Sequence, residues 1–128
     1  MRADEIPVAN TPPGGYGDEL PPPILGECTE PLGPGIPDLR GMWRVVAVDW
    51  KSGSAPLVDR VSDHVERIEQ CGDRVCITAG GVIHDMRADG TVDHGVHDVA
   101  AAGGAEITVV CTFEDGVHVL RPEGLPGV

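Results

Sequence analysis

Histidine and aspartate crowd one short segment of the chain and could in principle hold a metal ion. The segment reads Asp93-His94-Gly95-Val96-His97-Asp98, and His84 and Asp85 precede it by a few residues. If the segment is a β-strand, side-chain alternation sends His94 and His97 to opposite faces. These two histidines then cannot chelate one ion unless the segment is a loop, so no metal site is predicted.

His118 is the histidine that we expect to point into the protein. Its inward companions are either His94 with Asp85 opposite it, or His84 with His97, and both alternatives stay open. An inward histidine could ligate haem, polarise a ligand carbonyl or act as a base, or it could simply be a hydrogen-bonded interior residue. No cofactor is predicted; His94 and His118 would be the ligands if a metal or haem were bound.

Signals for catalysis are missing from the sequence. The predicted strand register places no serine, cysteine or carboxylate beside a histidine as a nucleophile pair. The chain also has neither a glycine-rich phosphate loop opening a helix nor a Gly-x-Ser-x-Gly elbow. The sequence therefore favours a non-catalytic protein.

The four cysteines Cys28, Cys71, Cys76 and Cys111 are expected to stay reduced, since we predict a cytoplasmic chain. A turn at Gly72-Asp73 would place Cys71 and Cys76 diagonally on one face, roughly 7 Å apart, beyond relaxed disulfide geometry. No Cys-x-x-Cys pair supports structural zinc. Cys111 is interpreted as a small buried hydrophobe.

Length and charge restrict the class of protein and of partner. A chain of 128 residues suits about one domain. Its net charge of −12 repels phosphate backbones and anionic lipid surfaces, so neither nucleic acid nor membrane is an expected partner. The acidic start at Asp4 and Glu5 does not resemble a secretory signal, and no apolar run reaches a membrane span, so a cytoplasmic location is predicted.

Residues 1–38 differ in composition from residues 39–128, and we treat the two as an arm and a β domain. The arm holds nine of the twelve prolines and seven acidic residues against one basic residue, Arg2. Such a segment cannot fold alone and should be an extended, partly polyproline chain. It is either a solvated tail or a docking arm whose apolar anchors enter a partner's groove. The anchors would be Tyr16, Leu20, Ile24, Leu25, Leu32 and Ile36.

Beyond residue 38, short runs rich in valine, isoleucine and threonine predict an all-β domain, because no apolar recurrence at helical spacing persists. Seven strands are predicted at Met42–Trp50, His64–Gln70, Arg74–Ala79, Val82–Arg87, Thr91–Val99, Glu106–Glu114 and Val117–Arg121. Gly72-Asp73, Asp89-Gly90 and Asp115-Gly116 are two-residue signals for tight hairpins. Neighbouring strands should therefore pair antiparallel.

Each hairpin turn fixes which residues share a face of the sheet. The Gly72-Asp73 turn predicts an inside set of Ile68, Val75, Ile77 and Ala79 and an outside set of Arg67, Glu69, Arg74 and Thr78. The Asp115-Gly116 turn groups Ile107, Val109, Cys111, Phe113, His118 and Leu120. The hairpin at residues 82–99 does not resolve: one face has Ile83, Val92 and Val96, and the other has Val82, Met86 and Val99. Either face could be inside.

An antiparallel meander removes its exposed edges by closing into an up-and-down barrel, which is the fold we predict. About eight strands enclose one small ligand. Since seven are predicted, another chain or the arm supplies the closing strand, or the chain is truncated, or the barrel stays open.

The motif Gly41-Met42-Trp43 at the first predicted strand, followed by a meander, resembles the lipocalin and calycin families, whose first strand begins with Gly-x-Trp. The resemblance implies a barrel whose tryptophan packs across the closed end and whose cavity holds small hydrophobic molecules. An arginine on the last strand of those families covers the tryptophan; here the chain ends before such a strand, and Arg121 comes too early for that role. The motif argues for fold, not for function.

Two functions of different classes follow. The first is a lipocalin-like, non-catalytic carrier of a small apolar ligand. Its lining would be Trp43, Val45, Ile68, Ile77, Val109, Phe113, His118 and Leu120. The alternative is an accessory or scaffold subunit that binds a larger protein or a second copy of itself through the arm and an open barrel edge. A haem-binding barrel using an inward histidine ranks below both.

Overall fold

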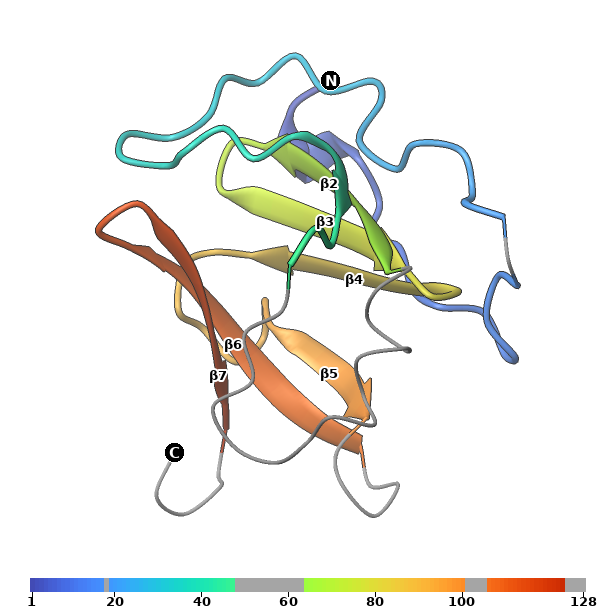
Figure 1. The fold of residues 1–128 in the computed structure, drawn as a ribbon. Helices are drawn as coiled ribbons and strands as arrows, with labels where there is room; N and C mark the ends of the chain where they lie inside the picture. Colours follow the sequence, from blue (N-terminus) through green and yellow to red (C-terminus); the bar gives the residue numbers. More distant parts are fainter. Residues whose placement is uncertain (18, 48–63, 101–105, 124–128) are drawn as a thin grey trace.

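The computed structural model describes residues 1–17, 19–47, 64–100 and 106–123, and within them the protein is all-β (Figure 1). The strands are β1 (Gly41–Arg44), β2 (Val65–Cys71), β3 (Arg74–Ala79), β4 (Val82–Arg87), β5 (Val96–Ala100), β6 (Glu106–Glu114) and β7 (Val117–Pro122). A single turn of 3₁₀-helix, η1, spans Ala3–Glu5. Each of the seven predicted strands has a counterpart, but two are shorter than predicted. β1 ends at Arg44, and its predicted end at Trp50 lies outside the described residues; β5 begins at Val96.

The strands form two antiparallel sheets, and among the described residues they do not close into a barrel. Sheet A has the order β1-β2-β3-β4 and sheet B the order β5-β6-β7. The predicted hairpin at Asp89-Gly90 is wrong, because β4 and β5 lie in different sheets. The chain crosses between the sheets there: the Gly90 amide donates to the Cys111 carbonyl over 3.0 Å, and Asp89 bridges to Thr112 of β6.

The two other predicted turns and their registers are confirmed. Cys71 lies opposite Arg74 across the Gly72-Asp73 turn. Glu114 lies opposite Val117 across the turn at Asp115 and Gly116, whose φ angles are 51° and 77°. Positive φ at both central residues is typical of two-residue hairpins. A short polar turn therefore fixes which residues of β6 and β7 share a face.

One apolar core lies between the two sheets. Its buried members are Val75, Met86, Val96 and Cys111, with Ile68, Ile77, Ala88, Val99 and Phe113 packed against them. Val75 is 1% exposed and Cys111 is fully buried. The predicted inward direction of Ile68, Val75 and Ile77 is confirmed, since all three belong to this core.

A second apolar core lies on the other face of sheet A, under the arm. It consists of Ala3, Ile6, Leu25, Cys71, Cys76 and Ile83, with Ala9, Tyr16, Ile24 and Cys28 packed against them. Arg74 and Thr78 lie on the face of sheet A that faces away from sheet B, as predicted, but the prediction that this face is exposed to solvent is wrong. Arg74 is 2% exposed and Thr78 is fully buried. The sequence does not indicate which face of the 82–99 segment is buried, because β4 is covered on both faces. Ile83 faces the arm and Met86 faces sheet B.

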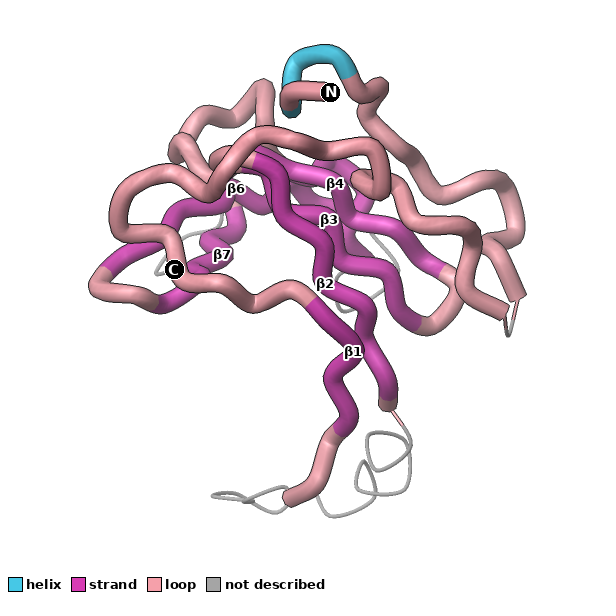
Figure 2. The backbone as a smooth tube through the Cα atoms, turned by 90° about the horizontal axis from the view of Figure 1, so that it is seen from above, coloured by secondary structure: helices cyan, strands magenta, loops and turns pink. Residues whose placement is uncertain are grey.

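The arm runs without a strand across sheet A, and Figure 2 shows its loops above the sheet. A disulfide joins Cys28 to Cys71 of β2. The solvated-tail interpretation and the expectation that all four cysteines are reduced are both wrong. Prolines prevent the arm from pairing its own backbone, so polar side chains of sheet A supply the partners: the Gln70 side chain accepts from the Leu39 amide over 2.6 Å and donates to the Pro37 carbonyl over 3.0 Å.

Candidate functional site

The residues predicted to line a ligand site gather on the facing surfaces of the two sheets. Trp43 lies opposite Glu66, which alternation places on the same face as Ile68, and Ile68 lies opposite Ile77. Val45 directly follows β1, and its amide donates to the His64 carbonyl over 3.3 Å.

Sheet B contributes the other half of this surface. Phe113 lies opposite His118, and Cys111 lies opposite Leu120, so these four side chains share one face with Val109. Phe113 and Cys111 belong to the core between the sheets, which shows that this face is the one directed at sheet A.

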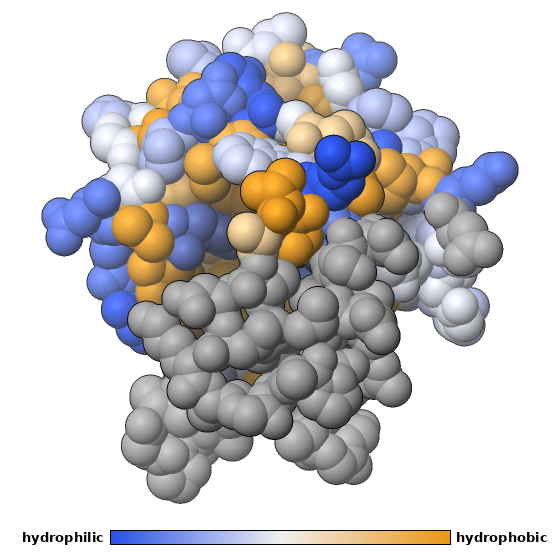
Figure 3. Space-filling view, in the orientation of Figure 1, coloured by the Kyte–Doolittle hydropathy of each residue, from blue (hydrophilic) through white to orange (hydrophobic). Residues whose placement is uncertain are grey.

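Burial divides the facing surfaces into a packed end and an open edge. Val109 is 5% exposed, whereas Trp43 on β1 is 49% exposed and Leu120 on β7 is 46% exposed. Both strands are the outer strands of their sheets, and in Figure 2 β1 extends away from the body of the protein. Figure 3 shows apolar residues, in orange, interspersed with polar ones on the face seen in Figure 1. We call the region at β1 and β7 the open edge; its apolar residues are Trp43, Phe113 and Leu120.

The Trp43 side chain is held in place although half of it is exposed. Its indole Nε1–H donates a 2.7 Å hydrogen bond to the Leu39 carbonyl, which precedes the strand. The polar atom of the ring is thereby satisfied by the backbone, and the apolar faces of the ring are left for other contacts.

His118 contacts a cysteine that the sequence reasoning did not associate with it. Its Nε2 lies 2.9 Å from the Cys111 Sγ, and its ring centroid lies 5.2 Å from that of Phe113. The predicted register contained the signal for this contact, because Cys111 is the diagonal neighbour of His118 across β6 and β7.

The Cys111 and His118 pair is neutral rather than an activated thiolate and imidazolium. Burial raises the pKa of the Cys111 thiol to about 12 and lowers the pKa of His118, against which the negative charge of Glu66 acts weakly in the opposite direction. Catalytic thiols have lowered pKa values and some exposure, and Cys111 has neither. This pair can donate and accept hydrogen bonds, but it does not form a nucleophile.

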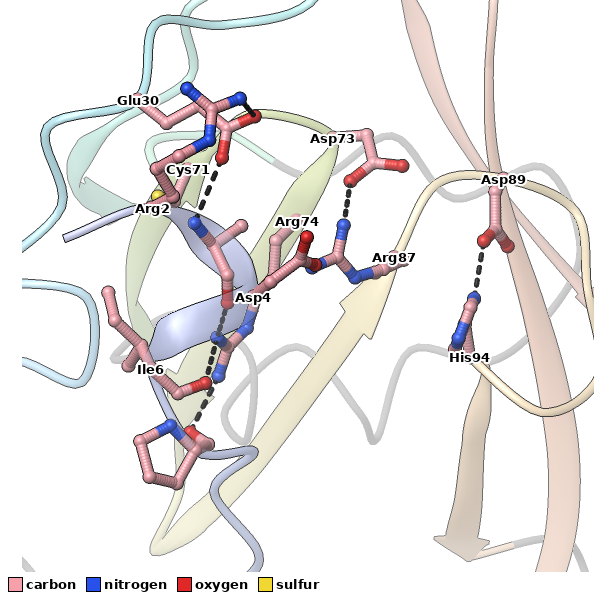
Figure 4. Close-up of polar contacts among 12 residues, drawn as sticks. Arg2, Asp4, Ile6, Glu30, Cys71, Asp73, Arg74, Arg87, Asp89 and His94 are labelled. Carbon is pink, nitrogen blue, oxygen red and sulfur yellow. Dashed lines mark hydrogen bonds and ion pairs between the residues drawn. The ribbon is translucent and has the colours of Figure 1, made fainter.

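The histidines of the 93–98 segment do not converge. His94 pairs with the Asp89 carboxylate, which Figure 4 shows apart from the other contacts drawn, and the His97 Nδ1 lies 3.2 Å from the Thr108 hydroxyl. His94 lies outside the strands, in the crossover between the sheets. In the described part of the chain, no group of three or more histidine, cysteine, aspartate or glutamate residues is arranged to hold a metal ion.

The apolar anchors of the arm contact the chain itself. Leu25 is 5% exposed within the core under the arm, and Ile24 and Tyr16 pack against that core. Leu32 and Ile36 are partly buried, while Leu20 is 40% exposed.

Three surface cavities border described residues, and they lie mainly along the arm. The cavity beside the 11–21 segment has a volume of about 1090 Å³, and one between the arm and the 93–98 segment has a volume of about 550 Å³. Of the predicted lining residues, only Ile68 borders any of the three. The open edge therefore lies apart from these three cavities.

Comparisons with family models, curated proteins and solved structures found no match for this chain. Among the helices of the described residues, none is long and apolar enough to cross a membrane.

Proposed function

We propose that the protein is a non-catalytic binding protein that holds a small apolar ligand at the open edge, between β1 of sheet A and β7 of sheet B. In this proposal the fold is an opened relative of the lipocalin and calycin barrel, in line with the Gly-x-Trp resemblance at Gly41-Met42-Trp43.

One observation carries the proposal. The predicted lining residues share the facing surfaces of the two sheets, and the large apolar side chains of Trp43 and Leu120 stay half exposed at the outer strands. Apolar area left in water at the end of an otherwise packed core is what a binding surface requires, because covering it supplies about 25 cal/mol per Å². The fixed indole of Trp43 reduces the side-chain entropy lost on binding.

The chemistry of the polar groups at this edge favours binding over catalysis. Burial raises the pKa of the Cys111 thiol to about 12, so at neutral pH this thiol is not a thiolate nucleophile, and burial lowers the pKa of His118, so its imidazole is neutral. Near them, the Glu66 carboxylate accepts from the His64 Nε2 over 2.9 Å. These groups suit the orientation of one polar end of an otherwise apolar ligand.

The accessory-subunit alternative has less support. In that alternative the arm binds a partner protein. In the structure, however, Leu25 of the arm is buried against sheet A, and a disulfide joins the arm to β2. What favours a protein partner is β1, whose four residues are all exposed at the edge of sheet A. Failure of ligand binding together with self-association through β1 would favour this alternative.

Titration with Nile red, a neutral apolar dye, tests the carrier. We expect saturable binding with a fluorescence increase, and we expect Trp43→Ala and Leu120→Ser each to weaken the affinity by about tenfold or more, equivalent to about 1.4 kcal/mol. The matched control is Val8→Ala, which shortens an apolar side chain that is 64% exposed on the arm and should leave the affinity unchanged. A signal that does not saturate, or an equal loss in the control, would overturn the proposal.

The disulfide also bears on location. Disulfides persist in oxidising compartments and are rare in the cytosol, so we propose an oxidising compartment in place of the predicted cytoplasmic one. Alkylation of protein isolated from its source under denaturing, non-reducing conditions should label the two free thiols, Cys76 and Cys111, and leave Cys28 and Cys71 unlabelled. Labelling of all four cysteines would contradict this location.

A further inference from the structure

We propose that the Cys28–Cys71 disulfide is a redox-controlled latch. In this proposal its reduction by a dithiol releases residues 21–30, the central arm, while residues 3–11, the arm tip, stay docked on sheet A. The latch concerns the outer face of sheet A and does not depend on ligand binding at the open edge.

The central arm is held by the disulfide, by the buried Leu25 side chain, by polar contacts to β2 and by hydrogen bonds to the first residues of the chain. The Thr29 amide donates to the Met1 carbonyl over 2.8 Å, and the Ala3 amide donates to the Glu30 carboxylate over 2.9 Å. The Glu69 carboxylate accepts from the amides of Ile24 and Leu25 over 3.0 and 2.9 Å, and the Arg67 guanidinium donates to the Pro21 carbonyl over 2.6 Å. The side chains of Arg67 and Glu69 are 13% and 11% exposed, so solvent reaches these contacts. Each such hydrogen bond exchanges for one to water and contributes little net stability, so the disulfide is the strongest constraint on this segment.

The arm tip has a separate and more deeply buried anchor. The Arg74 guanidinium donates to the carbonyls of Ala3, Ile6 and Pro7 over 2.9, 2.6 and 2.7 Å, and Figure 4 shows it directed at this part of the arm. Its side chain is 2% exposed and forms an ion pair with Asp85 of β4, whose own side chain is 1% exposed.

Two further contacts hold the tip. The Asp85 Oδ2, which also accepts from Arg74, accepts from the Ala9 amide over 3.0 Å. Independently of Arg74, the Thr11 hydroxyl exchanges hydrogen bonds with the backbone of Ile83. None of these contacts involves the disulfide. In the proposal they keep the tip docked, while the hydrogen bonds that join Met1 and Ala3 to Glu27, Thr29 and Glu30 break as the central arm leaves.

Of the two cysteines of the latch, Cys28 is the more exposed residue. Cys71 is fully buried, whereas Cys28 is partly exposed and borders a groove of about 350 Å³ together with Leu25 and Glu30. A dithiol thiolate would therefore attack the Cys28 Sγ, forming a mixed disulfide while the Cys71 Sγ leaves as a thiolate and takes up a proton. The second thiol of the dithiol then closes on the first, releasing Cys28 as a thiol; the protein disulfide is reduced by two electrons and the dithiol is oxidised to a cyclic disulfide.

Release of the central arm uncovers a defined part of sheet A. Leu25 is 5% exposed in the core that includes Cys71, and Ile24 packs against the same core. Their departure exposes the Cys71 thiol and leaves the Glu69 carboxylate without its two amide donors. The reduced and oxidised proteins therefore present different surfaces on this face.

Amide hydrogen exchange of the full-length protein, read by NMR with and without dithiothreitol, tests the latch. On reduction we expect the amides of Ile24 and Leu25 to exchange about tenfold faster or more, and the Ala9 amide to change by less than about twofold. The variant Cys28→Ala should show the fast pattern in both conditions. The matched control is Cys76→Ala, which removes a free thiol from the same core and should keep the dependence on dithiothreitol.

Two results would overturn the proposal. Unchanged exchange at Ile24 and Leu25 after complete reduction would mean that the non-covalent contacts suffice to hold the central arm. Equal acceleration at Ala9 and in β3 would mean that the disulfide maintains the whole fold, so that it is a structural staple and not a latch.

Discussion

At the scale of single residues, Arg74 shows how a charged side chain becomes part of a core. Alternation along β3 correctly grouped it with Glu69, but a charged face is ordinarily taken as solvent-exposed. Here the covering layer is a proline-rich backbone with unpaired carbonyls, and the guanidinium satisfies three of them while pairing with Asp85. The hydrogen bonds that Arg74 donates to Asp85 also raise the pKa of Arg74, so its charge is permanent.

The variant Arg74→Ala should lower the free energy of unfolding by about 3 to 5 kcal/mol, because it leaves the Asp85 carboxylate buried without its partner. Urea unfolding followed by circular dichroism measures this loss. The matched control is Arg121→Ala, which breaks the exposed ion pair with Glu114 and should change stability little. Equal losses in the two variants would show that Arg74 does not anchor the arm.

The buried thiols predict how stability depends on alkaline pH. Burial raises the pKa values of Cys76 and Cys111 from 9.0 to about 12. Between about pH 9 and about pH 12 the unfolded chain loses these protons and the folded chain keeps them, so stability is complete at neutral pH and falls as the pH rises through this window. Urea midpoints of the oxidised protein should decline with pH in this range, and the double variant Cys76→Ala, Cys111→Ala should decline less steeply. Identical slopes would contradict the shifted pKa values.

At the scale of elements, strands joined by Gly72-Asp73 and Asp115-Gly116 could be predicted with their registers, because a two-residue turn leaves little freedom in the pairing. The Asp89-Gly90 signal has the same composition but connects different sheets, and its partner is Thr112 of a distant strand. Local turn chemistry does not encode that non-local contact. The turn at Asp115-Gly116 thus predicts which residues of β6 and β7 share a face. The crossover from sheet A to sheet B at Asp89-Gly90 depends on contacts with β6 and could not be predicted from the turn.

Gly95 in this crossover provides a test at the level of the element. A Cβ at this position would lie 2.3 Å from the Val109 carbonyl oxygen, so Gly95→Ala must push the crossover away from β6. We expect a loss of about 1 to 3 kcal/mol in thermal or urea unfolding. In the control Gly26→Ala, the new Cβ would meet its nearest neighbour, the Pro23 side chain, at 3.5 Å, and stability should be nearly unchanged. A Gly95→Ala protein as stable as the control would mean that the crossover does not press on β6.

At the scale of the whole molecule, the arm and the division into two sheets could not be predicted from strand patterns. Composition identified residues 1–38 as unable to fold alone, which is consistent with the lack of strands among the described residues of the arm. Their partner is the outer face of sheet A in the same chain, which carries both apolar and charged side chains. The pairing of Cys28 with Cys71 is set by that docking, and neither cysteine carries a spacing signal for it. For the candidate site, the shared face of Phe113 and His118 could be predicted, whereas the exposure of Trp43 depends on how the sheets separate.

The net charge of −12 predicts a salt response that belongs to the molecule as a whole. Like charges repel more strongly in the compact state than in the expanded unfolded chain, and added salt screens this repulsion. The most buried ion pair, Arg74 with Asp85, is protected from the same screening. The urea concentration at the unfolding midpoint should therefore rise as sodium chloride is added, both below and above physiological ionic strength.

The double variant Glu19→Lys, Glu123→Lys changes two exposed residues and brings the net charge from −12 to −8, since each substitution adds two positive units. Its midpoint should rise less with salt than that of the unmodified protein, and a midpoint that instead falls with salt in both proteins would show that surface ion pairs outweigh the general repulsion.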